Sequence, residues 1–233
     1  MNLLRSDGPL LRIGHRGAAA LAPANTIEAV EAALAVGVDA VEVDIFWRDS
    51  LVIGHSRREL GIEPVSADAM FGFLAERAPE VGVLTDLKLA ERERELVEVL
   101  RRHGLVERTV ACTSDAGVLR RLRELEPSLA RSRTNPRGRV YIGGRRTHVP
   151  VAGPMVWMLR QTLPLRIPAL VREVDASAMT LSRRVVTRAA VERCHELGVA
   201  VLVWTVNNRA LATRLNQLGV DGIITDDPHI LGD

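Results

Sequence analysis

The amino-acid sequence predicts an α/β fold, a (β/α)₈ barrel formed as a single domain over residues 1–233. The first observation is size: the chain has 233 residues, 47% hydrophobic and 26% charged, and barrels of this class often comprise about 200–250 residues. The second is alternation, because short apolar runs are separated by segments with helical apolar spacing. The third is a missing motif, since Gly14-His15-Arg16-Gly17 lacks the G-x-G-x-x-G spacing of a dinucleotide-binding, doubly wound sheet.

The predicted elements alternate from one end of the chain to the other. The strands are expected at Leu10–Gly14, Ala40–Trp47, Gly82–Leu87, Arg108–Thr113, Leu129–Arg133, Val174–Met179, Ala200–Val206 and Gly222–Thr225, with a hairpin-like extension at Leu51–Gly54. The helices, with apolar residues three or four positions apart, are expected at Thr26–Val36, Glu91–Leu100, Asp115–Leu125, Arg188–Leu197 and Asn208–Leu218.

Capping residues mark the ends of these helices. Gly37 and Gly219 directly follow two of the predicted helices, where a left-handed residue commonly ends a helix. Asn25, Asp115 and Asn207 stand just before helical segments and are predicted to be N-caps, because a short polar side chain can accept a hydrogen bond from the first turn.

The composition excludes several classes of partner and location. A formal net charge of only +2 and an aromatic content of 3% disfavour a nucleic-acid-binding surface. Cys112 and Cys194 are too few for a disulfide framework, which fits a reducing compartment. Residues 1–17 show no signal-peptide pattern, and no apolar run approaches the ~20 residues needed to span a bilayer. We therefore expect a cytoplasmic protein.

Residues 134–172, after the fifth predicted strand, interrupt the regular pattern and are expected to form a long insertion. It begins with a basic stretch that holds Arg137, Arg139, Arg145, Arg146 and His148, and the apolar run Val149–Leu159 follows. One interpretation is a solvated loop that leads into a helix covering the barrel. The other is a lid or membrane-touching element, in which Val156, Trp157 and Met158 enter the interface while basic residues face anionic headgroups.

Acidic side chains lie at the predicted carboxyl ends of two consecutive strands, where the active site of such a barrel is found. Glu42 and Asp44 are two residues apart and share one strand face, as do Asp86 and Lys88 on the next strand. Three unpaired carboxylates crowded together would be costly. Because oxygen ligands suit a hard ion, Glu42, Asp44 and Asp86 are predicted to hold one divalent cation, Mg²⁺ or Ca²⁺. The alternative is a plain salt bridge to Lys88, the single lysine among 31 basic residues.

Two of the six histidines, His15 and His55, follow predicted strands beside the acidic residues. Two imidazoles that flank a metal-bound anion are the arrangement expected for a general acid and a general base. Arg16 and Lys88 add positive charge for a phosphate, one as a planar fork and the other as a compact ammonium group. Together these residue types predict cleavage at a phosphoryl centre.

The same residues form part of a series of motifs that resembles the glycerophosphodiester phosphodiesterase family over most of the chain, least so between residues 134 and 172. In chain order the motifs are Gly14-His15-Arg16-Gly17, Pro23-Ala24-Asn25-Thr26, Glu42-Val43-Asp44, His55, Asp86-Leu87-Lys88, Trp204-Thr205-Val206-Asn207 and Gly222-Ile223-Ile224-Thr225-Asp226-Asp227-Pro228. The resemblance implies a TIM barrel that hydrolyses small phosphodiesters to glycerol 3-phosphate and an alcohol. It also implies functional residues: Glu42, Asp44 and Asp86 as metal ligands, His15 and His55 as the catalytic pair, and Arg16, Lys88 and Trp204 as substrate contacts.

Departures from the family pattern bear on the substrate. Ala24 stands where the family usually has Glu, Ser56 follows His55 where Asp is usual, and Asp86 replaces a commoner Glu. The D-x-K form, with only a short segment before it, is similar to phospholipase D-type members that act on lysophospholipids, so a lipid substrate at a membrane surface is one alternative. Ala24 and Ser56 motivate a second, a barrel that binds a phosphorylated ligand without turnover.

Overall fold

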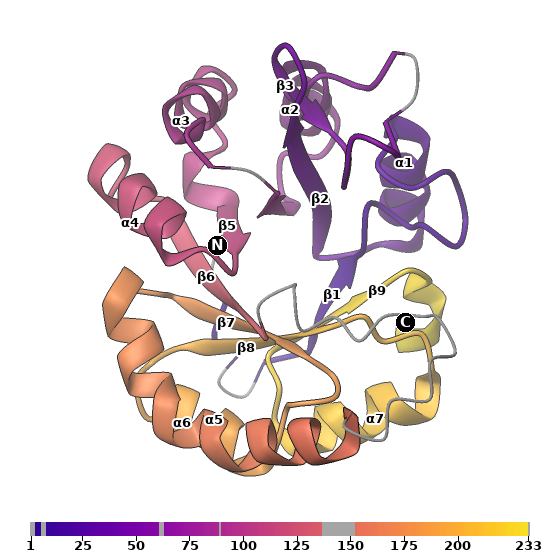
Figure 1. Ribbon diagram of the computed structural model, residues 1–233. Helices are drawn as coiled ribbons and strands as arrows, with labels where there is room; N and C mark the ends of the chain where they lie inside the picture. The colour runs from indigo at the N-terminus through magenta and orange to yellow at the C-terminus, as the bar shows by residue number, and fades with distance from the viewer. Residues whose placement is uncertain (1–2, 6–7, 61–62, 89, 137–151, 233) are drawn as a thin grey trace.

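The computed structural model describes residues 3–5, 8–60, 63–88, 90–136 and 152–232, and it confirms the predicted barrel (Figure 1). The predicted basic segment Arg137 to His148 lies outside the described residues. Within the described residues, eight parallel strands form the wall: β1 (Leu11–Gly14), β2 (Ala40–Trp47), β4 (Gly82–Leu87), β5 (Thr109–Thr113), β6 (Ala130–Asn135), β7 (Ala178–Ser182), β8 (Ala200–Trp204) and β9 (Gly222–Thr225). The predicted hairpin-like extension is β3 (Leu51–Ile53), which pairs with β2 in antiparallel orientation.

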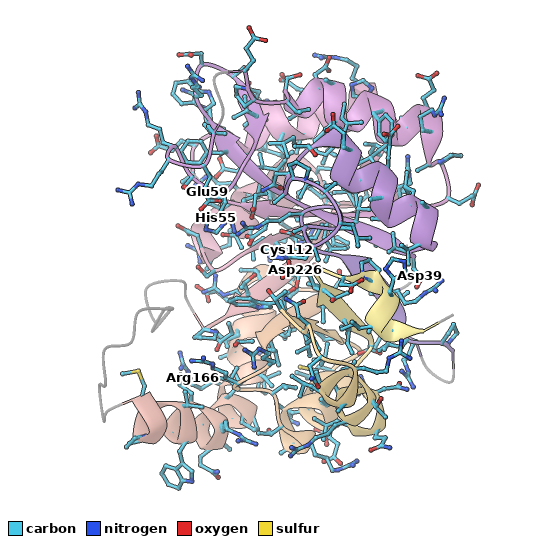
Figure 2. All side chains as sticks on the ribbon, turned by 90° about the vertical axis from the view of Figure 1, so that its right-hand side faces the viewer. Asp39, His55, Glu59, Cys112, Arg166 and Asp226 are labelled. Carbon is cyan, nitrogen blue, oxygen red and sulfur yellow. The ribbon has the colours of Figure 1, made fainter. Side chains whose placement is uncertain are left out.

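Strand pairing closes the sheet into a barrel. Each parallel strand pairs with its neighbour along the chain, and β1 closes the ring by pairing with both β2 and β9, through Ile13↔Ala40 and Ile13↔Ile224. All carboxyl ends of the parallel strands therefore lie at one end of the barrel. Figure 2 shows His55 and Glu59 at this end and Asp39, which precedes β2, at the opposite end.

Seven α-helices of the described residues surround the strands: α1 (Ile27–Val36), α2 (Ala67–Arg77), α3 (Glu93–Arg102), α4 (Ala116–Leu125), α5 (Ala152–Val174), α6 (Arg188–His195) and α7 (Arg209–Leu218). Two short 3₁₀ helices complete the described elements, η1 (Val106–Arg108) and η3 (Pro228–Leu231). Apolar side chains fill the layer between strands and helices, and a separate cluster that includes Ile13, Leu84, Val110 and Leu202 fills the barrel interior. Buried polar residues such as Ser132, Thr180 and Glu42 share this interior with the apolar cluster.

Two of the three predicted N-caps were assigned one residue too early. Thr26, not Asn25, accepts the hydrogen bond from the first turn of α1, and Asn208, not Asn207, does so for α7. Asp115 caps α4 as predicted. The two displaced asparagines were misassigned because capping chemistry alone does not distinguish adjacent polar residues.

The predicted strand Val174–Met179 is wrong at its start, because α5 continues through Val174 and β7 covers Ala178–Ser182. Leu163, Ile167, Val171 and Val174 recur at helical spacing and are buried against the barrel, which keeps this segment helical. Much of the described part of residues 134–172 is therefore the helix of a βα unit. Among the described residues, no helix combines the length and hydropathy needed to cross a bilayer.

Candidate active site

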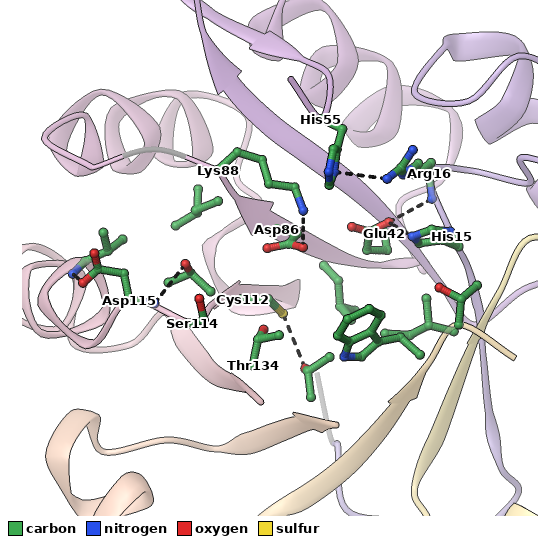
Figure 3. A pocket seen from close by; sticks show the side chains of 18 of the residues that line it. His15, Arg16, Glu42, His55, Asp86, Lys88, Cys112, Ser114, Asp115 and Thr134 are labelled. Atoms are coloured by element: carbon green, nitrogen blue, oxygen red, sulfur yellow. Dashed lines mark hydrogen bonds and ion pairs between the residues drawn. The ribbon is translucent and has the colours of Figure 1, made fainter. Parts of the chain in front are cut away.

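A cavity of about 790 Å³ opens at the carboxyl end of the barrel. Its lining includes seven of the eight site residues predicted from the sequence: His15, Arg16, Glu42, His55, Asp86, Lys88 and Trp204. Asp44, the eighth, is 1% exposed and lies behind the wall of the cavity. Figure 3 shows the side chains of His15, Arg16, His55 and Lys88 gathered around Glu42 and Asp86.

The structure brings the three predicted metal ligands together. Glu42 and Asp44 project from β2 and Asp86 from β4, and the strands are in register, with Asp44 paired to Asp86. One carboxylate oxygen from each of the three lies within 4.8 Å of the others. Alternation along the two parallel strands turns all three side chains to the interior, so adjacent strands converge on one point.

The negative charge of these acids is compensated unevenly. Burial and the neighbouring Asp44 carboxylate raise the pKa of Glu42 to about 7. Burial acts in the same direction on Asp44, but His55, Lys88 and Arg16 outweigh it and hold the pKa of Asp44 below its ordinary value. The charged form of Glu42 is thus less well compensated than that of Asp44. Three hard oxygen donors with this excess of negative charge fit a divalent cation such as Mg²⁺ or Ca²⁺.

Lys88 joins two of the acids directly. Its Nζ lies 2.5 Å from Asp86 Oδ2 and 2.8 Å from Asp44 Oδ1. Burial alone would lower the pKa of Lys88, but the carboxylates of Asp86, Asp44 and Glu42 outweigh burial and raise it, so the ammonium form is retained. The salt bridge considered as an alternative therefore exists for Asp44 and Asp86, and it leaves Glu42 without a contact to this cation.

His15 is held by a carboxylate at the end of the last strand. Its Nδ1 lies 2.5 Å from Asp226 Oδ1, and its Nε2 lies 3.9 Å from Glu42 Oε2. Burial disfavours the charged imidazolium, but Glu42 and Asp226 outweigh burial and raise the pKa of His15. The Asp226 contact fixes the ring orientation and leaves Nε2 directed toward the acidic cluster, where it can exchange a proton.

His55 is placed on the other side of the cluster by Arg16. His55 Nδ1 lies 3.1 Å from Arg16 Nη2 and 3.4 Å from Asp44 Oδ1. Arg16 Nε lies 3.0 Å from Asp44 Oδ2, and its Nη1 lies 3.4 Å from Glu59 Oε2. The backbone N–H of Arg16 also donates to Glu42 Oε2 at 2.9 Å. Arg16 therefore links His55 to the acids instead of standing alone as a phosphate contact.

The loop after β1 requires unusual backbone geometry to make these contacts. Arg16 has a φ of 52° and Gly17 a φ of 83°. A Cβ at Gly17 would lie 2.5 Å from the backbone of Ala29 on α1, so only glycine allows this close approach. The tight turn carries Arg16 back over the acidic cluster directly after His15.

Three positioning residues were not assigned to the site from the sequence. Asn25, with a φ of 63°, donates from Nδ2 to Asp44 Oδ2 at 2.9 Å and accepts the Asp44 backbone N–H at 3.1 Å. Asn207 donates to Asp226 Oδ2 and accepts the Asp226 backbone N–H at 3.0 Å. Asp226 in turn holds His15. Their presence within the family motifs was the available signal, whereas capping chemistry predicts a helix N-cap at both Asn25 and Asn207.

Comparisons with known proteins agree with this geometry. Residues 15–49 and 63–230 match the model of the glycerophosphoryl diester phosphodiesterase family. A glycerophosphodiester phosphodiesterase of Caldanaerobacter subterraneus is 24% identical over 257 residues, which covers 95% of this chain and 96% of the relative.

Solved structures show the same fold. The crystal structure of a glycerophosphodiester phosphodiesterase from Parabacteroides distasonis is 21% identical, with a TM-score of 0.72 and coverage of 94% of this chain and 93% of that one. An Oleispira antarctica phosphodiesterase, solved with the product sn-glycerol-3-phosphate, is 21% identical with a TM-score of 0.67, covering 96% and 95% of the two chains. The family match extends over most of the chain and includes the acidic cluster and His15. The chain therefore belongs to the glycerophosphoryl diester phosphodiesterase family.

Proposed function

We propose that the protein hydrolyses glycerophosphodiesters to glycerol 3-phosphate and an alcohol, with His15 and His55 exchanging protons and Glu42, Asp44 and Asp86 holding one divalent cation. The observation that carries the proposal is the convergence of three carboxylates, with ligand atoms within 4.8 Å of one another, between two histidines at the mouth of one cavity. Family membership adds independent support for the reaction class.

The two histidines are suited to different proton transfers because different residues hold them. Asp226 anchors His15 through Nδ1, whereas Nδ1 of His55 faces both Arg16 and Asp44. One imidazole would remove the proton of the attacking hydroxyl or water, and the other would protonate the departing alkoxide. A pair of this kind contributes about 10²–10⁴-fold to the rate.

The remaining polar residues orient the substrate and the acids. Arg16 and Lys88 border the cavity with cationic groups, so a phosphoryl oxygen entering there would meet positive charge on two sides. Asn25 keeps the Asp44 carboxylate in place by two hydrogen bonds. When bound, a divalent cation supplies Lewis-acid polarisation of the phosphodiester.

The test is hydrolysis of glycerophosphocholine and glycerophosphoethanolamine, with and without excess EDTA. We expect turnover that EDTA abolishes, and a loss of about 10²–10⁴-fold in His15→Ala and His55→Ala. His229→Ala is the matched control, because His229 is exposed and does not line the cavity. Unchanged turnover in EDTA would contradict the metal, and product binding without hydrolysis would favour the ligand-binding barrel instead.

A cytoplasmic location is part of the proposal. Cys112 and Cys194 are both buried and form no disulfide. Burial raises the pKa of Cys194 to about 12, so this thiol stays protonated and unreactive at neutral pH.

A second candidate, action on lysophospholipids at an anionic membrane surface, is favoured by α5. Trp157, Met158 and Leu165 are 65%, 51% and 82% exposed. Met158 and Leu165 are seven residues apart and lie opposite the buried face of the helix. Exposed arginines accompany them at positions 160, 166 and 172, and Figure 2 shows Arg166 on the outside of the molecule. Exposed apolar side chains with basic residues along the same helix are a feature of interfacial binding.

Vesicle co-sedimentation separates the two candidates. The lipid candidate predicts binding to phosphatidylglycerol vesicles but not to phosphatidylcholine vesicles, with a loss of binding in a Trp157→Ala/Leu165→Ala variant. Leu21→Ala, at an exposed leucine outside α5, is the control. Absence of binding to the anionic vesicles, together with faster turnover of glycerophosphocholine than of lysophosphatidylcholine, would eliminate the lipid candidate.

A further inference from the structure

The cavity at the carboxyl end of the barrel has two chemically different walls. The charged wall comes from β1, β2, β4 and their loops, and contains the acids, the histidines, Arg16 and Lys88. The neutral wall comes from β5 to β9 and includes Cys112, Thr134, Thr180 and Trp204. Figure 3 shows Cys112 and Thr134 across the cavity from His55 and Lys88. The two walls would therefore contact different parts of a bound phosphodiester.

One charged residue, Asp115, lies near the neutral wall, and its carboxylate caps a helix. Asp115 is the one charged residue from β5 onward among the described residues that line the cavity. Its Oδ1 accepts the backbone N–H of Gly117 at 2.7 Å and of Val118 at 3.4 Å, as the N-cap of α4. The helix terminus thus engages Oδ1 of Asp115, and the other described residues of the neutral wall are uncharged.

Two buried polar atoms of the neutral wall lack a hydrogen-bond partner. Thr134 Oγ1 and Trp204 Nε1 are buried, and neither makes a hydrogen bond within the part of the chain that the structure describes. The nearby Thr180 hydroxyl, by contrast, is 2.6 Å from Ser132 Oγ. An unpaired buried polar atom is unfavourable, so two of them in one cavity wall indicate partners that a ligand supplies.

The two residues lie on the strands that flank β7. Thr134 lies near the carboxyl end of β6 and Trp204 at the end of β8, and β7 connects them in the sheet through Thr134↔Thr180 and Ser182↔Trp204. The side chains thus border the cavity from strands on either side of β7. A group lying over β7 could contact both.

The chemistry of the two atoms defines that group. The indole N–H can only donate a hydrogen bond, whereas the threonine hydroxyl can donate or accept. An ammonium group cannot accept from the indole, and a trimethylammonium group can neither donate nor accept. A carboxylate would find no cationic side chain to pair with among the described residues of the neutral wall. An uncharged hydroxyl, which both donates and accepts, satisfies both atoms.

We infer that Thr134 and Trp204 form a hydroxyl-binding subsite for the glycerol unit of the substrate, while the phosphoryl group lies against the charged wall. The inference rests on the proposed function only in placing the phosphoryl group beside the acidic cluster. It assigns Thr134 a role in specificity, and it gives the indole N–H of Trp204 a role beyond apolar contact.

Calorimetric titration of the divalent-cation-loaded protein with glycerol 3-phosphate and with methyl phosphate tests the subsite, because both ligands carry the same phosphate group and only the first has hydroxyls. We expect wild-type protein to bind glycerol 3-phosphate at least about 5-fold more tightly. Thr134→Val and Trp204→Phe should each weaken glycerol 3-phosphate binding by about 3–10-fold, the range of one neutral hydrogen bond, and leave methyl phosphate binding unchanged. Thr134→Ser should restore the preference.

Thr85→Val is the matched control. The Thr85 hydroxyl is also buried without a partner among the described residues, but Thr85 does not line the cavity. It should change the affinity of neither ligand. A wild type without preference for glycerol 3-phosphate, or a Thr134→Val variant that weakens both ligands equally, would overturn the subsite. Selective binding without hydrolysis of any diester would refute the proposed function and leave the subsite intact, and melting curves identify any variant that fails to fold.

Discussion

The two ends of the barrel each carry a histidine–aspartate pair, yet the surroundings of the two pairs differ. At the carboxyl end, His15 Nδ1 lies 2.5 Å from Asp226 Oδ1, and His15 borders the cavity. At the amino end, His195 Nε2 lies 2.8 Å from Asp221 Oδ2, and neither residue lines that cavity. The same pair of residue types can therefore line the active-site cavity at one end and have a structural role at the other.

Asp221 shows what the architectural pair does. It is 1% exposed and accepts the backbone N–H of Val201 at 2.7 Å and of Arg5 at 3.1 Å. It thus connects the N-terminal segment to β8 just before β9 begins. What distinguishes His15 from His195 is not its aspartate but the acidic cluster 3.9 Å from its Nε2. A histidine–aspartate pair alone is consequently weak evidence for a site.

The largest expected effect is at the acidic cluster of the carboxyl end. Asp44→Asn removes one carboxylate charge from the cluster and weakens the ion pairs that Asp44 makes with Lys88 and Arg16. We expect hydrolysis to fall by about 10³-fold or more, because both the cation and the cationic side chains lose their anchor. Steady-state assays measure this, with the exposed Asp49→Asn variant as control. Activity within about 10-fold of wild type would separate Asp44 from the mechanism.

The paired variants Asp226→Asn and Asp221→Asn compare the two ends directly. Asp226→Asn should lower kcat about 10–100-fold with little change in KM and shift the pH–rate profile, because the anchor of His15 loses its charge. Asp221→Asn should leave activity within about 2-fold at 25 °C and lower the free energy of unfolding by roughly 2–3 kcal/mol, because a buried charged hydrogen-bond acceptor is lost. Similar losses of activity in both variants would erase the distinction between the ends.

The pH dependence of stability provides a smaller test. In the protein freed of metal by chelator, the pKa of Glu42 is raised to about 7, above its ordinary value of 4.5. The folded state therefore binds this proton more tightly than the unfolded state, so the contribution to stability is complete below pH 4.5 and is lost as the pH rises through 7. We expect the free energy of unfolding to fall by about 1–3 kcal/mol between pH 5 and 8.

Denaturant titrations at several pH values measure this slope, and Glu42→Gln should flatten it. Adding Mg²⁺ or Ca²⁺ should also reduce the slope in wild-type protein, because cation binding favours the ionised carboxylate. An equally steep slope in Glu42→Gln would show that another group causes it.

The smallest expected effect is at the start of α1, where Asn25 was the predicted N-cap and Thr26 is the observed one. Thr26→Ala removes the N-cap and should cost about 1 kcal/mol of unfolding free energy without changing kcat. Asn25→Ala should instead lower kcat, because Asn25 holds Asp44. Thermal melting and steady-state kinetics on both variants check the assignment. A catalytic loss in Thr26→Ala that equals the loss in Asn25→Ala would contradict it.

The sequence was sufficient for the barrel and for the residues that gather at its mouth. Strand alternation places Glu42, Asp44 and Asp86 on interior faces, and register between adjacent strands then brings them together. These are local properties of strands, so periodicity and fold class determine them. The boundary at Val174 was predicted wrongly, because the residues around it fit the start of a strand as well as the end of a helix, and burial of Val171 and Val174 against the barrel favours the helix.

The contacts that position the site were harder to predict for a related reason. Asn25 reaches Asp44 and Asn207 reaches Asp226 through turns whose backbone geometry is set by tertiary structure. Likewise, that the Thr134 hydroxyl lacks a hydrogen-bond partner among the described residues can be recognised only when its neighbours in the structure are known. Residue type predicts which chemistry is available, whereas the partner of each side chain follows from the three-dimensional arrangement.

The most direct test of the metal centre is the amount of divalent cation bound at equilibrium by the wild-type protein and by Glu42→Gln and Asp44→Asn, measured by dialysis against Mg²⁺ or Ca²⁺. We predict one ion per wild-type chain, and at least a 10-fold loss of affinity in each variant while both remain folded. Wild-type protein that retains no stoichiometric ion, or variants that bind it as tightly as wild type, would contradict the account.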